Sequence, residues 1–207
     1  LRGTLQTTPY SMESTQDDPK KILRRMFDSG TGFYRIKKEV PHFPLAAVKS
    51  RLISKSLAKN DKKLFRGWCP MLSGAIATLA HTNQKVLYLN KPLIILGQPA
   101  NSASAINHDN ETFKRMHKKR QIRFALLADD ENFSNLCADT MLETQACFKE
   151  DLSTYDINWQ SYFKACVDEI LKEKRHKRSM RKLIDVLNAA KNKTTPLELL
   201  YLFFLTA

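Results

Sequence analysis

Apolar residues recur at helical spacing along most of this chain. A first helix is predicted after Asp17-Asp-Pro-Lys20, because an aspartate can cap free backbone N–H groups and Pro19 suits a first helical turn. Its apolar face consists of Ile22, Leu23, Met26 and Phe27, and Gly30 and Gly32 end it. The same spacing predicts further helices over residues 45–57, 71–81, 131–148, 157–174 and 179–190.

Extended segments are predicted only in the first half of the chain. Residues 84–89 form a β-prone run, and 93–96 form a second one after the turn at Asn90-Lys-Pro92. Residues 65–70 are expected to be an extended link, because a residue before proline avoids the α region. Residues 1–16 are polar and aperiodic, which is typical of a loop or arm. The predicted fold class is helix-rich α+β.

The chain ends in an apolar run, residues 196–207, far shorter than the roughly 20 residues that cross a bilayer. The run predicts a core helix, and the alternative is the beginning of a longer hydrophobic segment. The first residue is Leu1, and no signal-peptide pattern follows it. We therefore expect the chain to be processed or cut from a longer protein.

Composition favours a folded domain without a metal site. The chain is 43% hydrophobic and 27% charged, which is enough to bury a core. No C-x-x-C pair occurs, and no histidines cluster beside the cysteines, so neither a zinc site nor a disulfide framework is predicted. Buried free thiols in a reducing cytosol are expected at Cys69, Cys137, Cys147 and Cys166.

The net charge is +13, and two basic runs, residues 114–123 and 172–182, carry much of it. Three interpretations remain open: a solvated helix face, attraction to anionic lipid headgroups or to a diphosphate-bearing substrate, and binding of nucleic acid. Aromatic residues are not interleaved with the basic runs as single-strand stacking would need. The sequence also has no recognisable helix-turn-helix or zinc finger.

Three features follow one another between Phe65 and Ser104. Phe65-Arg-Gly-Trp-Cys-Pro70 leads into a helix of small residues, a strand follows, and Lys91-Pro-Leu-Ile-Ile-Leu-Gly97 precedes Ser102 and Ser104. This order resembles the back half of bacterial family 2 glycosyltransferases over about residues 40–170. The resemblance implies the acceptor-side part of a GT-A fold, which transfers a sugar from a nucleotide-sugar to a glycan or lipid-linked acceptor in cell-surface polysaccharide synthesis.

Two departures from the family pattern affect the expected activity. In the family, an Asp-x-Asp motif in the N-terminal half holds a divalent metal, Mg or Mn, against the diphosphate; the chain contains no such motif. Many relatives also carry an aspartate after the proline that opens the acceptor-side helix, where this chain has Met71. Since inverting transfer needs a carboxylate base, the catalytic residues stay unknown. We expect a fragment without the donor half and without its own cofactor.

The resemblance implies acceptor binding by a small set of residues. Trp68 would offer an aromatic plane to a sugar and Arg66 a guanidinium to hydroxyl or phosphate groups; the alternative for Trp68 is packing against the next helix. The loop after Gly97 would bring backbone N–H groups to a substrate, or it is a plain surface connection. The full candidate set is Arg66, Trp68, Ser73, Gln98, Asn101 and Ser102.

Two histidines have alternative interpretations. His108 and Asp109 are an acid–base pair or part of a turn, and His81 is expected to interact with the C-terminal dipole of its helix.

The chain is divided into a polar arm (1–16), an acceptor-side portion (17–108) and a helical C-terminal region (109–207). The expected location is the cytoplasm, including the inner membrane face. The alternative functions are a basic helical module that binds nucleic acid or an anionic membrane surface, and a helical interaction protein without chemistry.

Overall fold

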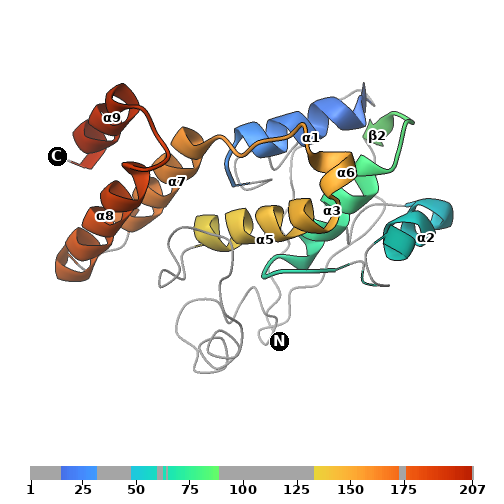
Figure 1. Ribbon diagram of the computed structural model, residues 1–207, viewed down its shortest axis with the longest axis horizontal. Coiled ribbons are helices and arrows are strands. Elements are labelled where there is room, and N and C mark those ends of the chain that lie inside the picture. Colours follow the sequence, from blue (N-terminus) through green and yellow to red (C-terminus); the bar gives the residue numbers. More distant parts are fainter. Residues whose placement is uncertain are drawn as a thin grey trace, which may run out of the picture. The chain divides into compact units, whose positions relative to one another are not determined.

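The computed structural model describes residues 15–31, 48–59, 63, 65–88, 133–172 and 176–206. These residues form eight helices and a two-stranded antiparallel sheet, so the helix-rich α+β class is confirmed (Figure 1). In chain order the elements are β1 (Thr15–Asp17), α1 (Pro19–Asp28), α2 (Ser50–Lys59), α3 (Pro70–Ala80), β2 (Val86–Tyr88), α5 (Phe133–Cys147), α6 (Lys149–Leu152), α7 (Trp159–Lys172), α8 (His176–Ala190) and α9 (Pro196–Thr206).

The chain divides into two units by its internal contacts. One contains Leu1–Asp17 and Lys85–Gln121, and the other contains Asp18–Gln84 and Ile122–Ala207, with all the described helices. The predicted boundary between residues 108 and 109 stays a prediction; α3 and α5, which lie on either side of it, pack together inside the helical unit. Contacts between α3 and α5 place both helices in one unit although they are far apart in the sequence.

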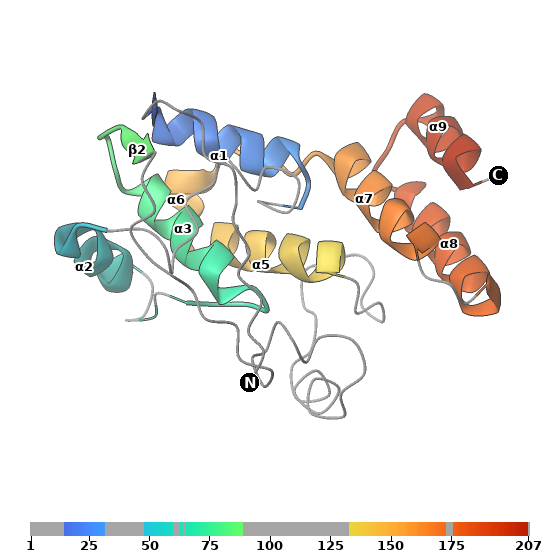
Figure 2. The same cartoon turned by 180° about the vertical axis from the view of Figure 1, so that it is seen from behind.

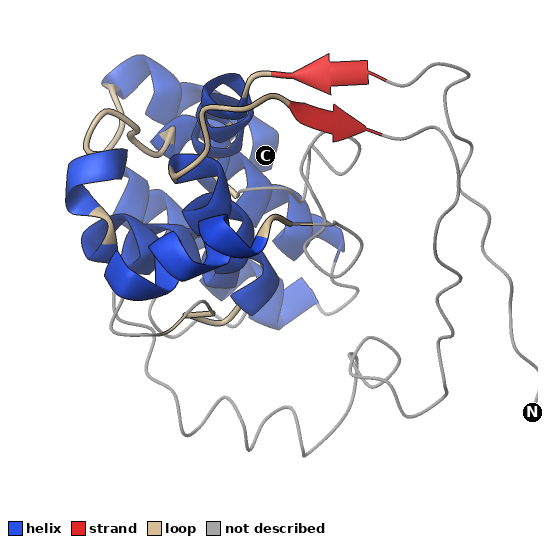
Figure 3. Cartoon of the chain, turned by 90° about the vertical axis from the view of Figure 1, so that its right-hand side faces the viewer, coloured by secondary structure: helices blue, strands red, loops and turns tan. Residues whose placement is uncertain are grey.

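The strand pair agrees with the sequence prediction only in part. β2 lies within the predicted strand 84–89, and it pairs antiparallel with β1 (Figure 3). In their register, Gln16 lies opposite Leu87. The predicted polar arm includes Thr15 and Gln16, which the structure places in β1. Three polar residues have no apolar alternation that would indicate a strand. The second predicted strand, 93–96, lies outside the described residues.

Helix α3 lies at the centre of the helical unit, in contact with α1, α2 and α5 (Figure 2). It begins at Pro70 and ends at Ala80, one residue earlier at each end than the predicted 71–81. The small side chains of Gly74, Ala75 and Ala77 are buried, and they let neighbouring helices approach closely. Leu72 and Ile76 are fully buried between them. This helix is therefore the core of the unit.

Helix α1 forms as predicted and is fixed at both ends. The Asp18 carboxylate accepts a hydrogen bond from Lys20 N at 2.8 Å, which caps the first turn. At the other end, Gly30 has a φ of 69°. The Phe27 carbonyl there accepts a hydrogen bond from Asn158 N at 3.0 Å, just before α7. The predicted apolar face is buried at all four of its positions: Ile22, Leu23, Met26 and Phe27.

Two buried polar contacts join α5 to α7. The Tyr162 hydroxyl donates to Asn135 Oδ1 at 2.6 Å, and both side chains are fully buried. Glu169 accepts from the backbone N and the hydroxyl of Ser134 at 3.2 and 3.0 Å. Because Ser134 lies in the first turn of α5, the Glu169 carboxylate satisfies a backbone N–H that has no partner inside the helix.

The last helix, α9, is helical as predicted, and several of its described apolar side chains are exposed. Leu197 is 80% exposed and Phe204 69%, and Leu200 and Tyr201 are also exposed. A helix that is apolar on all sides can turn only part of its surface toward α7 and α8, which α9 contacts. Among the described residues, no helix is both long enough and apolar enough to cross a membrane.

Candidate functional site

Three of the predicted acceptor-binding residues, Arg66, Trp68 and Ser73, lie where α3 begins. The loop before α3 turns at Gly67, whose φ is 66°. Thr140 of α5 accepts hydrogen bonds through Oγ1 from the backbone nitrogens of Trp68 and Cys69, both at 3.0 Å. A Cβ atom on Gly67 would lie 2.6 Å from the same oxygen, so only glycine allows this approach. We call this arrangement the Thr140 clamp.

The described candidates of the predicted set differ in burial. Arg66 and Trp68 are half-buried. Ser73 is buried, and its hydroxyl accepts from Arg66 N at 2.8 Å and donates to the Pro70 carbonyl at 2.9 Å. Ser73 therefore shapes the loop from inside. The candidates at 98, 101 and 102, and the pair at 108 and 109, lie outside the described residues.

Two thiols meet beneath the clamp. Cys69 Sγ lies 3.5 Å from Cys137 Sγ of α5. Burial raises the pKa of Cys137 well above its ordinary value, and the contact with Cys69 raises it further. All four cysteines are free thiols, as predicted, but only Cys137 and Cys166 are buried. Cys137 is consequently an inert neutral thiol at physiological pH.

A second group of polar residues, which the sequence prediction did not bring together, lines a cleft between α2 and the end of α3. Two hollows of about 350 and 410 Å³ share Lys55, His81 and Asn83. Arg51 and Gln84 line the first hollow, and Lys59 and Asp151 line the second. We call these two hollows the α2–α3 cleft. Trp68 lines neither of them.

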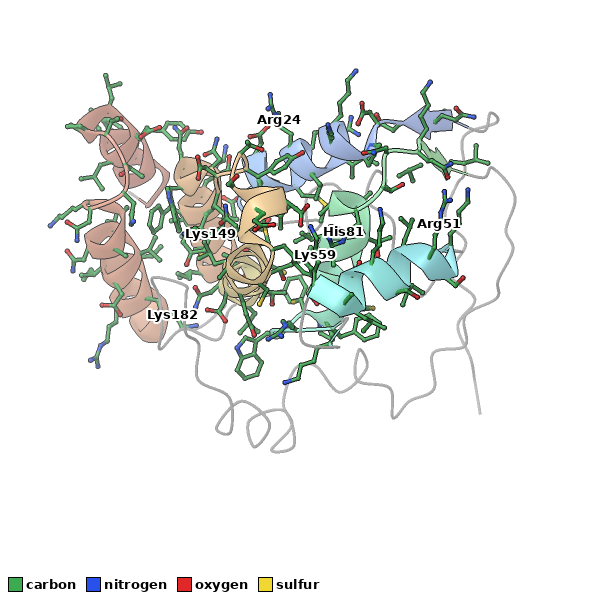
Figure 4. All side chains as sticks on the ribbon, turned by 45° about the vertical axis from the view of Figure 1, so that its right-hand side comes forward. Arg24, Arg51, Lys59, His81, Lys149 and Lys182 are labelled. Carbon is green, nitrogen blue, oxygen red and sulfur yellow. The ribbon has the colours of Figure 1, made fainter. Side chains whose placement is uncertain are left out.

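His81 connects the three elements around this cleft (Figure 4). Its Nδ1 lies 2.7 Å from the Ala77 carbonyl and 3.1 Å from Ser56 Oγ, and its Nε2 lies 3.4 Å from Asp151 Oδ2. A carbonyl can only accept a hydrogen bond, so Nδ1 carries a hydrogen. The predicted interaction of His81 with the C-terminal end of its helix is therefore confirmed.

Ser56, His81 and Asp151 have the composition of a catalytic triad but not its proton arrangement. The Ser56 hydroxyl donates to the Leu52 carbonyl at 2.9 Å, and Ser56 is fully buried. Because His81 Nδ1 is a donor, it cannot take a proton from Ser56. The three residues hold α2, α3 and α6 together and do not form a nucleophile.

Asp151 of α6 and Lys59 of α2 form an ion pair at the edge of the cleft, with Nζ 2.7 Å from Oδ2. Burial alone would raise the pKa of Asp151, but the hydrogen bond from Lys59 and the charges of His81 and Lys59 lower it below its ordinary value. The hydrogen bond to Asp151 raises the pKa of Lys59 against a smaller opposing effect of burial. The pair therefore favours the charged form of both groups.

Replacement of Lys59 by methionine should raise the pKa of Asp151. The variant lacks the hydrogen bond and the charge of Lys59, which lower this pKa, while burial still raises it. A lowered carboxyl pKa adds stability above the ordinary carboxyl pKa, and this contribution is lost as the pH falls through the lowered pKa. The stability difference between the wild type and Lys59→Met should accordingly shrink to nothing in acid. A carboxyl ¹³C NMR titration measures the shift. Lys55→Met, one turn away, is the control, and an unchanged Asp151 titration in Lys59→Met contradicts the prediction.

Replacement of Thr140 by valine should loosen the Thr140 clamp without a change in side-chain shape. The backbone nitrogens of Trp68 and Cys69 lose their acceptor on α5, which costs about 1–3 kcal/mol of unfolding free energy. Chemical denaturation measures this loss, and Thr140→Ser, which keeps the hydroxyl, should recover most of it. Equal stability of the valine variant and the wild type would show that the clamp does not hold the loop.

Within the described ranges, no group of three His, Cys, Asp or Glu residues is placed to hold a metal ion. Comparison of the chain with protein-family models, curated proteins and solved structures finds no match. The described residues thus offer two candidate sites: the Thr140 clamp with Arg66 and Trp68, and the α2–α3 cleft.

Proposed function

We propose that this chain is the acceptor-side portion of a glycosyltransferase-like protein. In this proposal, the complete protein transfers a sugar from a nucleotide-sugar to a glycan or lipid-linked acceptor in cell-surface polysaccharide synthesis. The observation that supports it most is the Thr140 clamp, which fixes the backbone on both sides of Trp68 while Arg66 and Trp68 stay half-buried.

An aromatic ring and a guanidinium on the same loop suit a carbohydrate. The ring offers an apolar plane to the C–H face of a sugar, and the guanidinium donates to its hydroxyl groups. A loop whose backbone is already fixed loses little conformational entropy when a ligand binds. The clamp thus gives Arg66 and Trp68 a preorganised position, and Ser73 supports it by accepting from Arg66 N.

The donor side of the reaction is assigned to a part of the protein other than the described residues. The family resemblance implies a divalent metal, Mg or Mn, held by an Asp-x-Asp motif, and the chain has no such motif. The described residues likewise offer no group of three potential ligands. Their own contribution is acceptor binding, and no step of sugar transfer is assigned to them.

Acceptor binding is tested on the purified chain by NMR titration with a panel of neutral and acidic oligosaccharides. Trp68→Ala should weaken binding about tenfold or more, since stacked aromatic anchors dominate such sites. Phe204→Ala, at an exposed aromatic residue on α9, is the control and should bind as the wild type does. The proposal would be contradicted if the wild type bound no oligosaccharide, or if Trp68→Ala bound as tightly as the wild type.

The isolated 207-residue chain should not transfer sugar when it is mixed with nucleotide-sugars, an acceptor and Mg²⁺ or Mn²⁺. Release of the nucleotide measures turnover. Activity in this assay would contradict the assignment of the donor site to another part of the protein.

A second candidate function, binding of an anionic membrane surface without catalysis, is favoured by α9. The exposed side chains of Leu197, Leu200, Tyr201 and Phe204 recur at i, i+3, i+4 and i+7, so they form one apolar stripe. Lys191 and Lys193 are exposed in the turn just before this helix. An apolar stripe beside cations suits a lipid interface, whereas nucleic acid requires only the charge.

Vesicle co-sedimentation tests this second candidate. The chain should bind phosphatidylcholine vesicles that contain phosphatidylserine, and the double variant Leu197→Asp/Phe204→Asp should not. Ile184→Asp, at an exposed position on α8, is the control. Equal sedimentation of the wild type and the double variant would exclude α9 as a membrane contact.

A further inference from the structure

We infer that the α2–α3 cleft is a binding site for a phosphate or diphosphate group, held by Arg51 and Lys55 of α2 and by the polar residues after α3. These residues differ from Arg66 and Trp68, so the inference does not depend on the proposed transferase function. It concerns the first hollow of the cleft, of about 350 Å³. That volume is at the lower end of small-molecule sites and suits a small anion.

The charge on α2 is concentrated on one side. Arg51, Lys55 and Lys59 stand at i, i+4 and i+8, so they share one face of the helix, and each lines at least one of the two hollows. Figure 4 shows Lys59 near His81, where α2 meets the end of α3, and Arg51 toward the start of α2. Three cations on one helix face repel one another unless an anion lies among them.

A protein carboxylate neutralises only one of these three cations. Lys59 pairs with Asp151, whereas neither Arg51 nor Lys55 has an ion-pair partner in the part of the chain that the structure describes. No acidic residue lines the first hollow. Two positive charges therefore face a concave surface without a compensating charge, which is the arrangement that concentrates anions.

The opposite wall of the hollow supplies hydrogen-bond donors in a fixed loop. Lys49 Nζ donates to Gln84 Oε1 at 2.5 Å, so the amide NH₂ of Gln84 points away from Lys49. Thr82 Oγ1 accepts from Gln84 N at 3.1 Å and orders the backbone between them. Asn83, which is exposed, adds a second amide. Amide donors opposite an arginine and a lysine match the oxygens of a phosphate group.

His81 lies at the base of the cleft, next to Asp151. The side chain of His81 is only 4% exposed, and it lines both hollows. Its Nε2 is buried and has no hydrogen-bond partner among the described residues, with Asp151 Oδ2 3.4 Å away. That nitrogen faces the Asp151 carboxylate of the second hollow, so the proposed anion site in the first hollow depends on Arg51 and Lys55.

The chemistry favours phosphate over a single carboxylate. A guanidinium binds two phosphate oxygens at once, and a lysine ammonium contributes a point charge. Two cations and two amides together match a group with two or more negative charges. The same chemistry occurs in a soluble phosphate ester and in a lipid phosphate headgroup.

The test is a ¹H–¹⁵N NMR titration of the chain with inorganic pyrophosphate, followed by vesicle binding with phosphatidylcholine alone and with added phosphatidic acid. We expect saturable shifts in the amides of Arg51, Lys55 and residues 82–84. The double variant Arg51→Gln/Lys55→Gln should weaken binding about 100-fold, at roughly tenfold for each lost charge-assisted contact. Because both side chains are exposed and their charges repel each other, this variant should unfold at a temperature no lower than that of the wild type.

A matched control removes the same charge elsewhere. Lys21→Gln/Arg24→Gln changes two exposed cations on α1 and should bind pyrophosphate as the wild type does. Loss of binding in the first double variant alone supports the site, and the vesicle experiment then shows whether a lipid headgroup also reaches it. Absence of pyrophosphate binding together with absence of a phosphatidic acid effect would overturn the inference. Equal weakening by both double variants would also overturn it, since only unspecific charge attraction would remain.

Discussion

Replacement of Gly30 by alanine is expected to destabilise the helical unit by about 3 kcal/mol or more. Gly30 has a φ of 69°, a region that alanine occupies only with strain. Its Cβ atom would also lie 2.7 Å from Tyr162 Cα and 2.8 Å from the Asn158 carbonyl oxygen. Both atoms belong to the backbone at the start of α7, so they cannot rotate away. The end of α1 would have to separate from α7.

Urea denaturation at equilibrium measures this effect as a lower midpoint at an unchanged slope. Two further variants separate its causes. Gly30→Asn keeps the steric conflict but tolerates a positive φ better, so a similar loss in both variants identifies the conflict as the main cause. Asp28→Ala, at an exposed position of the same helix, should change stability by less than about 0.5 kcal/mol. A Gly30→Ala protein as stable as the wild type would show that α1 does not rest on α7.

Replacement of Phe163 by alanine is the second change with a large expected effect, about 3–5 kcal/mol of unfolding free energy. Phe163 is fully buried on α7, with its ring centroid 4.9 Å from that of Tyr162 and 6.4 Å from that of Trp159. Helix α7 contacts α5, α8 and α9. Loss of this ring leaves a cavity in the middle of the layer that joins them.

Thermal and chemical denaturation measure the loss, and Leu171→Ala is the matched control on the same helix. Leu171 is 50% exposed, so its truncation removes little buried surface and should cost far less than the change at Phe163. Similar losses at both positions would mean that α7 is not a buried layer.

The helices could be predicted because their signals are local. The apolar face of α1 and the small-residue period of α3 are contained within single segments, and capping by Asp18 and the proline at Pro70 indicate where they begin. β1 could not be predicted in this way. It consists of three polar residues, and its strand conformation depends on hydrogen bonds to Val86–Tyr88 far along the chain.

The sites were predicted to different extents for the same physical reason. Arg66 and Trp68 stand out in the sequence as residue types, but the Thr140 clamp joins residues 72 and 71 positions apart. Asp151 reaches Lys59 across 92 positions. Such contacts have no sequence period. The cations of α2 do have one, at i, i+4 and i+8, and this spacing was the available signal for the cleft.

The contact between α3 and α5 has a consequence for the chain between them. Residues 81–132 connect two helices that pack together inside one unit, so this long connection is a closed loop in the native state. The entropy of loop closure rises only slowly with length, by about 0.6 kcal/mol for each doubling. The unfolding free energy of the helical unit should therefore depend only weakly on the length of this connection, so a change in the length of the segment between α3 and α5 should alter it only slightly.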